Sequence, residues 1–378
     1  MTPTDLLAHF ESRTSAIIDA ISEIVEIESP SHDVARSREV ADWVEKCFRS
    51  TGVDVTVERI FAEGDGEHLV IRAFPGEAKP VMLVGHTDTV HPVGTKEKNA
   101  TRIDGDRFYG CGIFDMKANI VLMIEAFRYV KENGITPPRP VTIFLSCDEE
   151  VGSHSGRAIL EREAANAEMA FVFEPSAAGR IKTGRKGTGQ YVVKTHGIPA
   201  HAGLEPEKGA SAILELARQI ERLQSMNDPS RGTTVNATTI SGGTTSNVIP
   251  EFAETEIDVR FTSIAEAERI DREIKALTPI DDRVEIKVIG GINRPPMERT
   301  DAIVQLFEKA RSIAASFDYE IGETQVGGAS DGNFIGAMGV PVLDGLGIAG
   351  DGAHTLHEHI LISDIAKRAT LVTLLLAS

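Results

Sequence analysis

Three short runs of apolar residues constrain the fold of this 378-residue chain more than any other feature. They span residues 81–84 (VMLV), 141–146 (VTIFLS) and 170–173 (AFVF). Continuous apolar runs of this length are typical of strands that are buried on both faces of a sheet. Helical patterns at 13–27 and 116–132 accompany them, and Gly134 is a natural stop for the second helix. The alternation predicts an α/β fold built on a mostly parallel central sheet.

The middle of the chain has a different pattern. In residues 256–261 (EIDVRF), apolar and polar side chains alternate, as they do in a strand with one solvated face. Two amphipathic helix patterns, at 209–225 and 264–277, are interleaved with four strand patterns, near 189–196, 233–240, 253–261 and 283–289. The order β-α-β-β-α-β predicts a small ferredoxin-like α+β layer.

After residue 294 the first pattern returns, with a helix near 301–316, a buried strand in VPVLDGL and a final helix near 362–376. A chain of this length also exceeds what one hydrophobic core usually serves. We therefore expect a discontinuous larger domain of residues 1–183 and 294–378. A smaller domain of residues 184–293 would be inserted into it.

Composition excludes several classes of partner. The formal net charge of −18 argues against nucleic acid, because phosphate groups require a basic surface. No apolar run approaches the length of a membrane span, and the first residues lack the pattern of a signal peptide. The three cysteines, Cys47, Cys111 and Cys147, are scattered and odd in number, so we expect reduced thiols in a cytoplasmic protein.

Residues of metal-binding types follow the predicted strands. His86 and Asp88 follow the first apolar run, Glu149 and Glu150 follow the second, and Glu174 follows the third. In open α/β sheets, ligands bind beyond the carboxyl ends of the strands. Taken singly, these residues have ordinary interpretations. His86 could be a hydrogen-bonded structural histidine, and Glu149 and Glu150 could be a solvated pair at the end of a strand. Their shared position favours a common site.

Two further candidates lie in glycine-rich loops. Asp115, in GCGIFDMK, directly precedes a helix and could cap it, whereas His354 closes the loop GIAGDGAH. Histidine and carboxylate ligands without cysteine suit zinc, with manganese or cobalt possible. Two histidines and three carboxylates exceed one tetrahedral zinc, and they fit two ions that share a bridging carboxylate.

Eight motifs occur in order along nearly the whole chain, followed by a terminal GDGAH. They are GHTDTV (85–90), GCGIFDMK (110–117), CDEEVGS (147–153), FEPS (173–176), GIPAHAG (197–203), SNVIPE (246–251), DVRF (258–261) and GGASDGNF (327–334). This set resembles the family of bacterial glutamate carboxypeptidases, acetylornithine deacetylases and succinyl-diaminopimelate desuccinylases. The resemblance implies a di-zinc peptidase domain that carries an inserted dimerisation (lid) domain.

The resemblance also implies which residues hold two zinc ions in each subunit. His86 and Glu174 would bind one ion, Glu150 and His354 the other, and Asp115 would bridge both. His357 and His359 are expected to lie at the surface, although His357 competes with His354 for the role of ligand. The family pattern further implies a cis peptide bond between Asp115 and Met116.

Glu149 corresponds to the general acid/base of the family, and Asp88 to the carboxylate that orients the ring of the histidine ligand. His201, in GIPAHAG, matches a lid-domain histidine that the family supplies to the neighbouring subunit, where it stabilises the oxyanion. These roles rest on the resemblance alone.

Four residues are candidates for substrate contacts: Arg260, Asn247, Gly328 and Ser330. Arg260 could hold a substrate carboxylate through two parallel hydrogen bonds, or it could pair with Glu256 or Asp258 on its own sheet. Asn247 resembles a family residue near the oxyanion or the substrate carboxylate. The loop with Gly328 and Ser330 could offer backbone N–H groups to an anion.

The expected activity is hydrolysis of an amide or peptide bond beside a free carboxylate, by a homodimer acting on a small N-acyl amino acid or peptide. Asn333 stands where the desuccinylase branch typically carries arginine, which favours the glutamate carboxypeptidase branch and release of a C-terminal glutamate or a similar amino acid. The alternative is an N-acyl amino acid deacylase of the acetylornithine type. A third possibility, an inactive binding homologue, is disfavoured because every expected ligand and the base are present.

Overall fold

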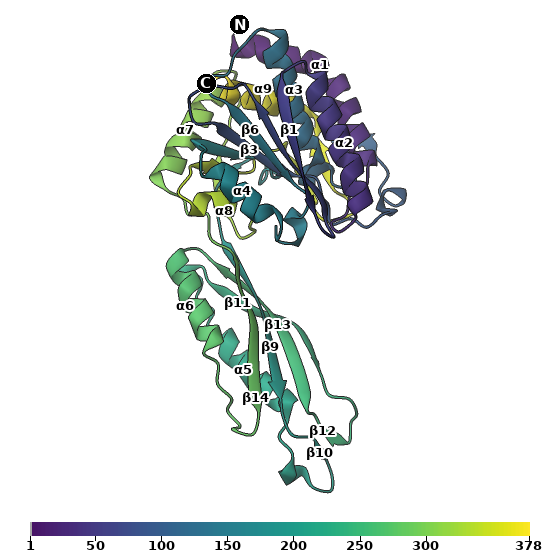
Figure 1. Ribbon diagram of the computed structural model, residues 1–378, viewed down its shortest axis with the longest axis vertical. Coiled ribbons are helices and arrows are strands. Elements are labelled where there is room, and N and C mark those ends of the chain that lie inside the picture. Colours follow the sequence, from purple (N-terminus) through teal and green to yellow (C-terminus); the bar gives the residue numbers. More distant parts are fainter. Residues whose placement is uncertain (1) are drawn as a thin grey trace. The chain divides into compact units, whose positions relative to one another are not determined.

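The computed structural model describes residues 2–378, which form two compact units (Figure 1). One unit comprises the chain up to Gly184 together with Arg299–Gln325 and Ser330–Ser378. The other comprises Arg185–Glu298 and Val326–Ala329. Arg185 and Met297 exchange two backbone hydrogen bonds of 3.0 Å, so the long segment of the second unit begins and ends at neighbouring points.

The first unit is built on a six-stranded sheet. Its strands are, in spatial order, β1 (Val55–Ala62), β2 (Gly66–Ala73), β6 (Val141–Ser146), β3 (Val81–His86), β7 (Met169–Val172) and β16 (Val342–Leu343). The last four run parallel to one another, whereas β1 and β2 form an antiparallel hairpin at one edge. Every residue of β3 and β6 is buried, as the apolar runs predict. The sheet is therefore mixed but mostly parallel.

Helices cover the sheet: α1 (Pro3–Glu26), α2 (Val34–Ser50), α3 (Ala118–Glu132), α4 (Gly156–Ala164), α7 (Asp301–Ala315), α8 (Gly332–Ala337) and α9 (Ile362–Leu376). The chain moves from β3 to β6 in one direction across the sheet and from β6 to β7 in the other. Because such crossovers are right-handed, α3 and α4 lie on opposite faces (Figure 1). Helices α1, α3 and α9 pack against one another, and α4 packs against α8.

A second small sheet positions two of the glycine-rich loops. It has the order β17 (Gly350–Asp351), β18 (His359–Leu361), β5 (Arg107–Tyr109) and β4 (Arg102–Asp104). Because β18 pairs with β5, the loop that contains His354 lies beside the segment that leads into Asp115. A further pair, β8 (Ile181–Arg185) and β15 (Glu323–Val326), completes the strands of this part of the chain.

The second unit contains the predicted ferredoxin-like layer. Its antiparallel sheet has the order β11 (Thr234–Gly242), β13 (Phe252–Phe261), β9 (Gly187–His196) and β14 (Glu285–Arg294). The buried face of the sheet, with Ile257, Val259 and Phe261, forms a core with α5 (Ala212–Gln224) and α6 (Ile264–Lys275). Two short strands, β10 (Ala200–His201) and β12 (Val248–Ile249), pair separately.

The fold class predicted from the sequence is thus confirmed, as an α/β fold with a separate antiparallel α+β layer. Within residues 2–378, no helix is both long enough and apolar enough to cross a membrane. All three cysteines are free thiols, as expected from their spacing.

Candidate metal centre

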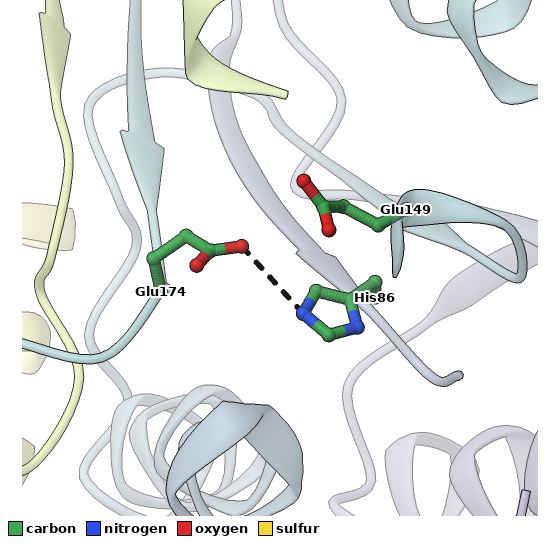
Figure 2. A group of neighbouring side chains, drawn as sticks. All are labelled: His86, Glu149 and Glu174. Carbon is green, nitrogen blue, oxygen red and sulfur yellow. Dashed lines mark ion pairs between the residues drawn. The ribbon is translucent and has the colours of Figure 1, made fainter. Parts of the chain in front are cut away.

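The carboxyl ends of three adjacent strands bring the predicted metal-type residues together. His86 is the last residue of β3, Glu149 and Glu150 begin a short turn after β6, and Glu174 follows β7. Figure 2 shows His86, Glu149 and Glu174 directed towards one another. One ligand atom from each of these three lies within 4.8 Å of the others, and the same is true of His86, Asp115 and Glu150. The parallel sheet therefore places both groups around His86.

Asp115 lies between two histidines. Its Oδ1 is 3.1 Å from His86 Nε2, and its Oδ2 is 3.3 Å from His354 Nε2. A carboxylate whose two oxygens face different nitrogen ligands has the arrangement that a bridge between two ions requires. The interpretation of Asp115 as a helix cap is wrong, since Lys117, and not Asp115, occupies the N-cap position of α3. The expected cis bond between Asp115 and Met116 is present.

His354, rather than its neighbours, is the C-terminal histidine that reaches the cluster. Its Nε2 lies 3.1 Å from Glu150 Oε2, in addition to its contact with Asp115. His357 is exposed, as expected, and places Nδ1 3.1 Å from Thr355 Oγ1. The expectation that His359 lies at the surface is wrong, because it is only 7% exposed: its ring packs against Tyr109 of the paired strand β5, and its Nδ1 lies 2.9 Å from the carbonyl oxygen of His357. Glu174 completes the set, with Oε1 3.5 Å from His86 Nε2.

The carboxylates of this cluster favour positive charge on the groups beside them. Burial opposes protonation of His86, yet its hydrogen bonds with Asp115 and Asp88 raise the pKa of this residue well above the ordinary value. Hydrogen bonds with Asp115 and Glu150 raise the pKa of His354 to about 10. Burial raises the pKa of Glu150, and the nearby charge of Asp115 adds to this effect. The carboxylates thus favour the protonated form of both histidines.

A divalent cation would balance the same carboxylates without protons on the histidines. Among residues 2–378, the Glu150 Oε1 atom is buried and has no hydrogen-bond partner. A buried carboxylate oxygen without a donor is costly unless a cation satisfies it. The donor set of imidazole nitrogens and carboxylate oxygens therefore fits divalent metal ions.

Asp88 connects the histidine to the two glutamates. The His86 Nδ1 atom lies 2.9 Å from the backbone oxygen of Asp88 and 3.4 Å from its carboxylate. That carboxylate also accepts hydrogen bonds from the backbone N–H groups of Glu149, at 3.2 Å, and Glu150, at 3.1 Å. The family resemblance implies a carboxylate beside the His86 ring, but it does not imply the contacts with backbone groups, because these leave no mark in residue types.

His201 lies in the second unit, in β10, and is exposed. Its Nδ1 accepts hydrogen bonds from the backbone N–H groups of Gly203, at 3.2 Å, and Leu204, at 3.1 Å. These bonds place the proton of the neutral ring on Nε2, which becomes the donor atom. Nearby, the backbone oxygen of Asn247 accepts from Ala202, and its side-chain Oδ1 accepts from Thr245 Oγ1 at 3.2 Å.

Arg260 pairs with Asp258, as the alternative interpretation proposed. Its Nε and Nη2 atoms lie 2.8–3.1 Å from the carboxylate oxygens of Asp258. The pair is partly exposed, so the guanidinium remains accessible to solvent. Gly328 offers its carbonyl oxygen to Arg185 Nη1 at 3.2 Å.

The structure contradicts the expectation that Ser330 offers its N–H group to an anion. Ser330 is fully buried, and its N–H donates to Asn333 Oδ1 at 2.9 Å. Its hydroxyl donates to Asp344 Oδ2 at 2.5 Å. Both donors are occupied by the protein itself, so Ser330 stabilises its own loop.

Known proteins are similar to this chain in sequence over most of its length. Residues 82–378 match the sequence profile of peptidase family M20/M25/M40. Carboxypeptidase G2 of Pseudomonas sp. (strain RS-16) is 28% identical over 362 residues, which cover 93% of this chain and 86% of that protein. Succinyl-diaminopimelate desuccinylase of Methylococcus capsulatus is 27% identical over 346 residues, which cover 83% of this chain and 89% of that protein.

Solved structures share the fold over nearly the full length. Aminopeptidase PepT from Bacillus cereus superposes with a TM-score of 0.79 at 23% identity, covering 96% of this chain and 98% of that one. The metallo-carboxypeptidase Sso-CP2 from Sulfolobus solfataricus gives a TM-score of 0.71 at 16% identity, covering 96% and 99%.

Proposed function

Because this chain belongs to peptidase family M20/M25/M40, and is thus a metal-dependent hydrolase, we propose that it uses two zinc ions to cleave an amide or peptide bond beside a free carboxylate. The observation that carries the proposal is the position of Asp115, whose two oxygens face His86 and His354 separately. In this proposal His86 and Glu174 hold one ion, and Glu150 and His354 hold the other. Cobalt or manganese could replace zinc, since both accept the same nitrogen and oxygen ligands.

Glu149 is the proposed general acid/base. When bound, the ions would lower the pKa of the attacking water and polarise the scissile carbonyl. The Glu149 carboxylate then accepts the proton of that water and delivers it to the leaving nitrogen. Glu149 is 8% exposed, and its backbone N–H is fixed by Asp88, so its side chain starts from a defined position.

His201 of the partner subunit is proposed as the donor to the developing oxyanion. The support is its hydrogen-bonding pattern, since an Nε2–H donor is what a negatively charged oxygen requires. The second unit is the proposed dimerisation unit. Its edge strand β11 exposes 64% of Ile240, and the adjacent helix α5 exposes 52% of Leu214. Such an apolar edge favours a partner that covers it.

The proposed substrate is a small N-acyl amino acid or peptide that ends in glutamate or a similar residue. The likeness to carboxypeptidase G2 supports this choice, as does Arg260, which can exchange its partner Asp258 for a substrate carboxylate. Asn333 stands where desuccinylases typically carry arginine, and its Oδ1 accepts a hydrogen bond from the N–H of Ser330 within its own loop. A deacylase of the acetylornithine type is the second candidate, because desuccinylases, which also remove an acyl group, are among the similar proteins.

Substrate choice can be tested with the zinc-loaded enzyme. We expect turnover of N-acyl and peptide conjugates of glutamate, and at least tenfold lower kcat/KM for N-acetylornithine and for the same conjugates with an amidated α-carboxylate. The Arg260→Ala variant should lose most of its preference for the free acid over the amide, because the two-point ion pair contributes to binding. Faster hydrolysis of N-acetylornithine would favour the deacylase instead.

Removal of metal should abolish activity. Incubation with a strong chelator is expected to reduce hydrolysis to background, and addition of zinc or cobalt should restore it, because the ligands remain in place. Metal analysis of the restored enzyme should give two ions per chain at full activity. Full activity with one ion per chain would exclude a bridging role for Asp115.

A further inference from the structure

Glu358 occupies a central position behind the metal centre. It lies four residues after His354, its side chain is fully buried, and its carboxylate receives four hydrogen bonds. Oε1 accepts from the backbone N–H groups of Phe114 and Asp115, both at 2.9 Å. Oε2 accepts from the backbone N–H of Gly112 at 2.9 Å and lies 2.7 Å from His91 Nε2.

These four contacts join three separate segments of the chain. His91 follows the loop of His86 and Asp88, residues 112–115 form the turn that carries Asp115, and Glu358 belongs to the segment of His354. The backbone oxygen of Glu358 also accepts from the N–H of Gly110 at 3.3 Å. One side chain therefore links the segments that carry three of the proposed ligands.

The turn is shaped to receive a carboxylate. Gly112 has a left-handed φ of 68°, and the N–H groups of residues 112, 114 and 115 point to a single side chain. Converging backbone N–H groups of this kind form an anion-binding concavity. A buried carboxylate is stable there because every donor is matched by one of its oxygen lone pairs. The last of these donors belongs to Asp115 itself, so Glu358 fixes the backbone from which the proposed bridge extends.

We propose that Glu358 is a positioning residue of the metal centre, which holds Asp115 and His354 at the spacing that a shared ion requires. This inference rests on the proposed function of the site. Glu358 is not one of the proposed ligands; it acts through the backbone of Asp115 and through its own place in the segment of His354.

A glutamine side chain has nearly the same shape as glutamate, but it cannot accept the same four hydrogen bonds. Glutamine offers one acceptor oxygen, so its NH₂ group would face two donors, either at Gly112 and His91 or at Phe114 and Asp115. The turn must then shift, and the oxygens of Asp115 move with it. Loss of a group that orients a ligand typically lowers metal affinity about 10–100-fold, and we expect Glu358→Gln to fall in this range.

Glu28 provides a matched control in the same unit. It is 5% exposed, and its two oxygens accept backbone N–H groups from Gly94 and Lys96, both at 2.9 Å. Glu28→Gln thus makes the same chemical change at a buried carboxylate that holds a loop, but without a bond to any proposed ligand. Zinc affinity of this variant should stay within about twofold of wild type, since the ligand geometry is untouched.

The experiment is a zinc titration of the metal-free proteins in competition with a chromogenic chelator, followed by the visible spectrum of the cobalt-loaded forms. A selective loss of zinc affinity and an altered cobalt spectrum in Glu358→Gln support the inference. Equal zinc affinity in Glu358→Gln and Glu28→Gln overturns it. Failure of the wild-type protein to bind zinc would instead overturn the metal centre on which the inference rests.

If Glu358→Gln does not fold, His91→Ala decides the matter, since it removes only one of the four donors. We then expect zinc affinity to fall at least threefold, because the Glu358 carboxylate loses one of its four donors and holds the turn of Asp115 less firmly, although every proposed ligand is retained. Unchanged zinc affinity in a folded His91→Ala protein would contradict the inference.

Discussion

Glu149→Ala is expected to retain both zinc ions and to lower kcat about 10²–10⁴-fold, the range for loss of a general acid/base. Glu150→Ala is expected to lose zinc. The reason is that the two adjacent side chains face different partners. Glu150 Oε2 is 3.1 Å from His354, and its Oε1 is buried without a donor among residues 2–378, so this carboxylate needs a cation. Glu149 approaches the His86 side, where Glu174 already supplies a carboxylate.

Glu149 could instead be a metal ligand, because its carboxylate lies within 4.8 Å of the ligand atoms of His86 and Glu174. Metal analysis and steady-state kinetics on both variants separate the two roles. Glu149→Gln serves as a further check, because the amide keeps the size of the side chain but cannot accept the proton. If zinc content fell equally in the Glu149 and Glu150 variants, Glu149 would be a ligand and the base would lie elsewhere.

His201→Ala is expected to lower kcat about 10²–10³-fold, as loss of one oxyanion donor does. If His201 serves the partner's site, mixing this variant with Glu149→Ala should restore activity. Random exchange makes half of the dimers mixed, and each mixed dimer has one site with both groups intact. Recovery should therefore reach about a quarter of the wild-type activity per total site, provided that each donor acts independently.

Two controls sharpen the complementation test. Blocking subunit exchange, by cross-linking each variant before mixing, should abolish the recovery. His196→Ala, a change at another half-exposed histidine of the second unit, should remain active from the start, because His196 pairs with Glu251 of the same unit and has no role in the proposed chemistry. An active His201→Ala protein, or mixtures that never recover, would show that His201 does not act in the partner's site.

The sequence predicts the sheet and most of the metal centre because both depend on strand periodicity. Apolar runs at 81–84 and 141–146 specify buried parallel strands, and the residues after each strand must then gather at one edge. The amphipathic patterns of the middle segment likewise predict its sheet and helices to within a few residues. Helix α1 is longer than its apolar pattern indicates, since the side chains of Thr2 and Asp5 cap it from its first turn.

Loop conformation explains what periodicity could not predict. The residue types do not show that Asp115 faces two histidines instead of capping α3. They also do not show that the N–H of Ser330 donates to Asn333. The contacts of Asp88 and Glu358 with backbone N–H groups are equally invisible, because every residue except proline carries such a group. These features depend on turns whose geometry is set by the whole fold.

The long segment of the second unit begins and ends at neighbouring points, and this arrangement has an evolutionary consequence. Arg185 and Met297 are hydrogen-bonded to each other, and all the proposed ligands lie in the first unit. An insert that leaves and rejoins its host at one place can change in length, shape or sequence without displacing a ligand. Descendants of such a chain can acquire new preferences through the insert while they inherit the hydrolytic chemistry intact, so selectivity and reactivity evolve at separate rates.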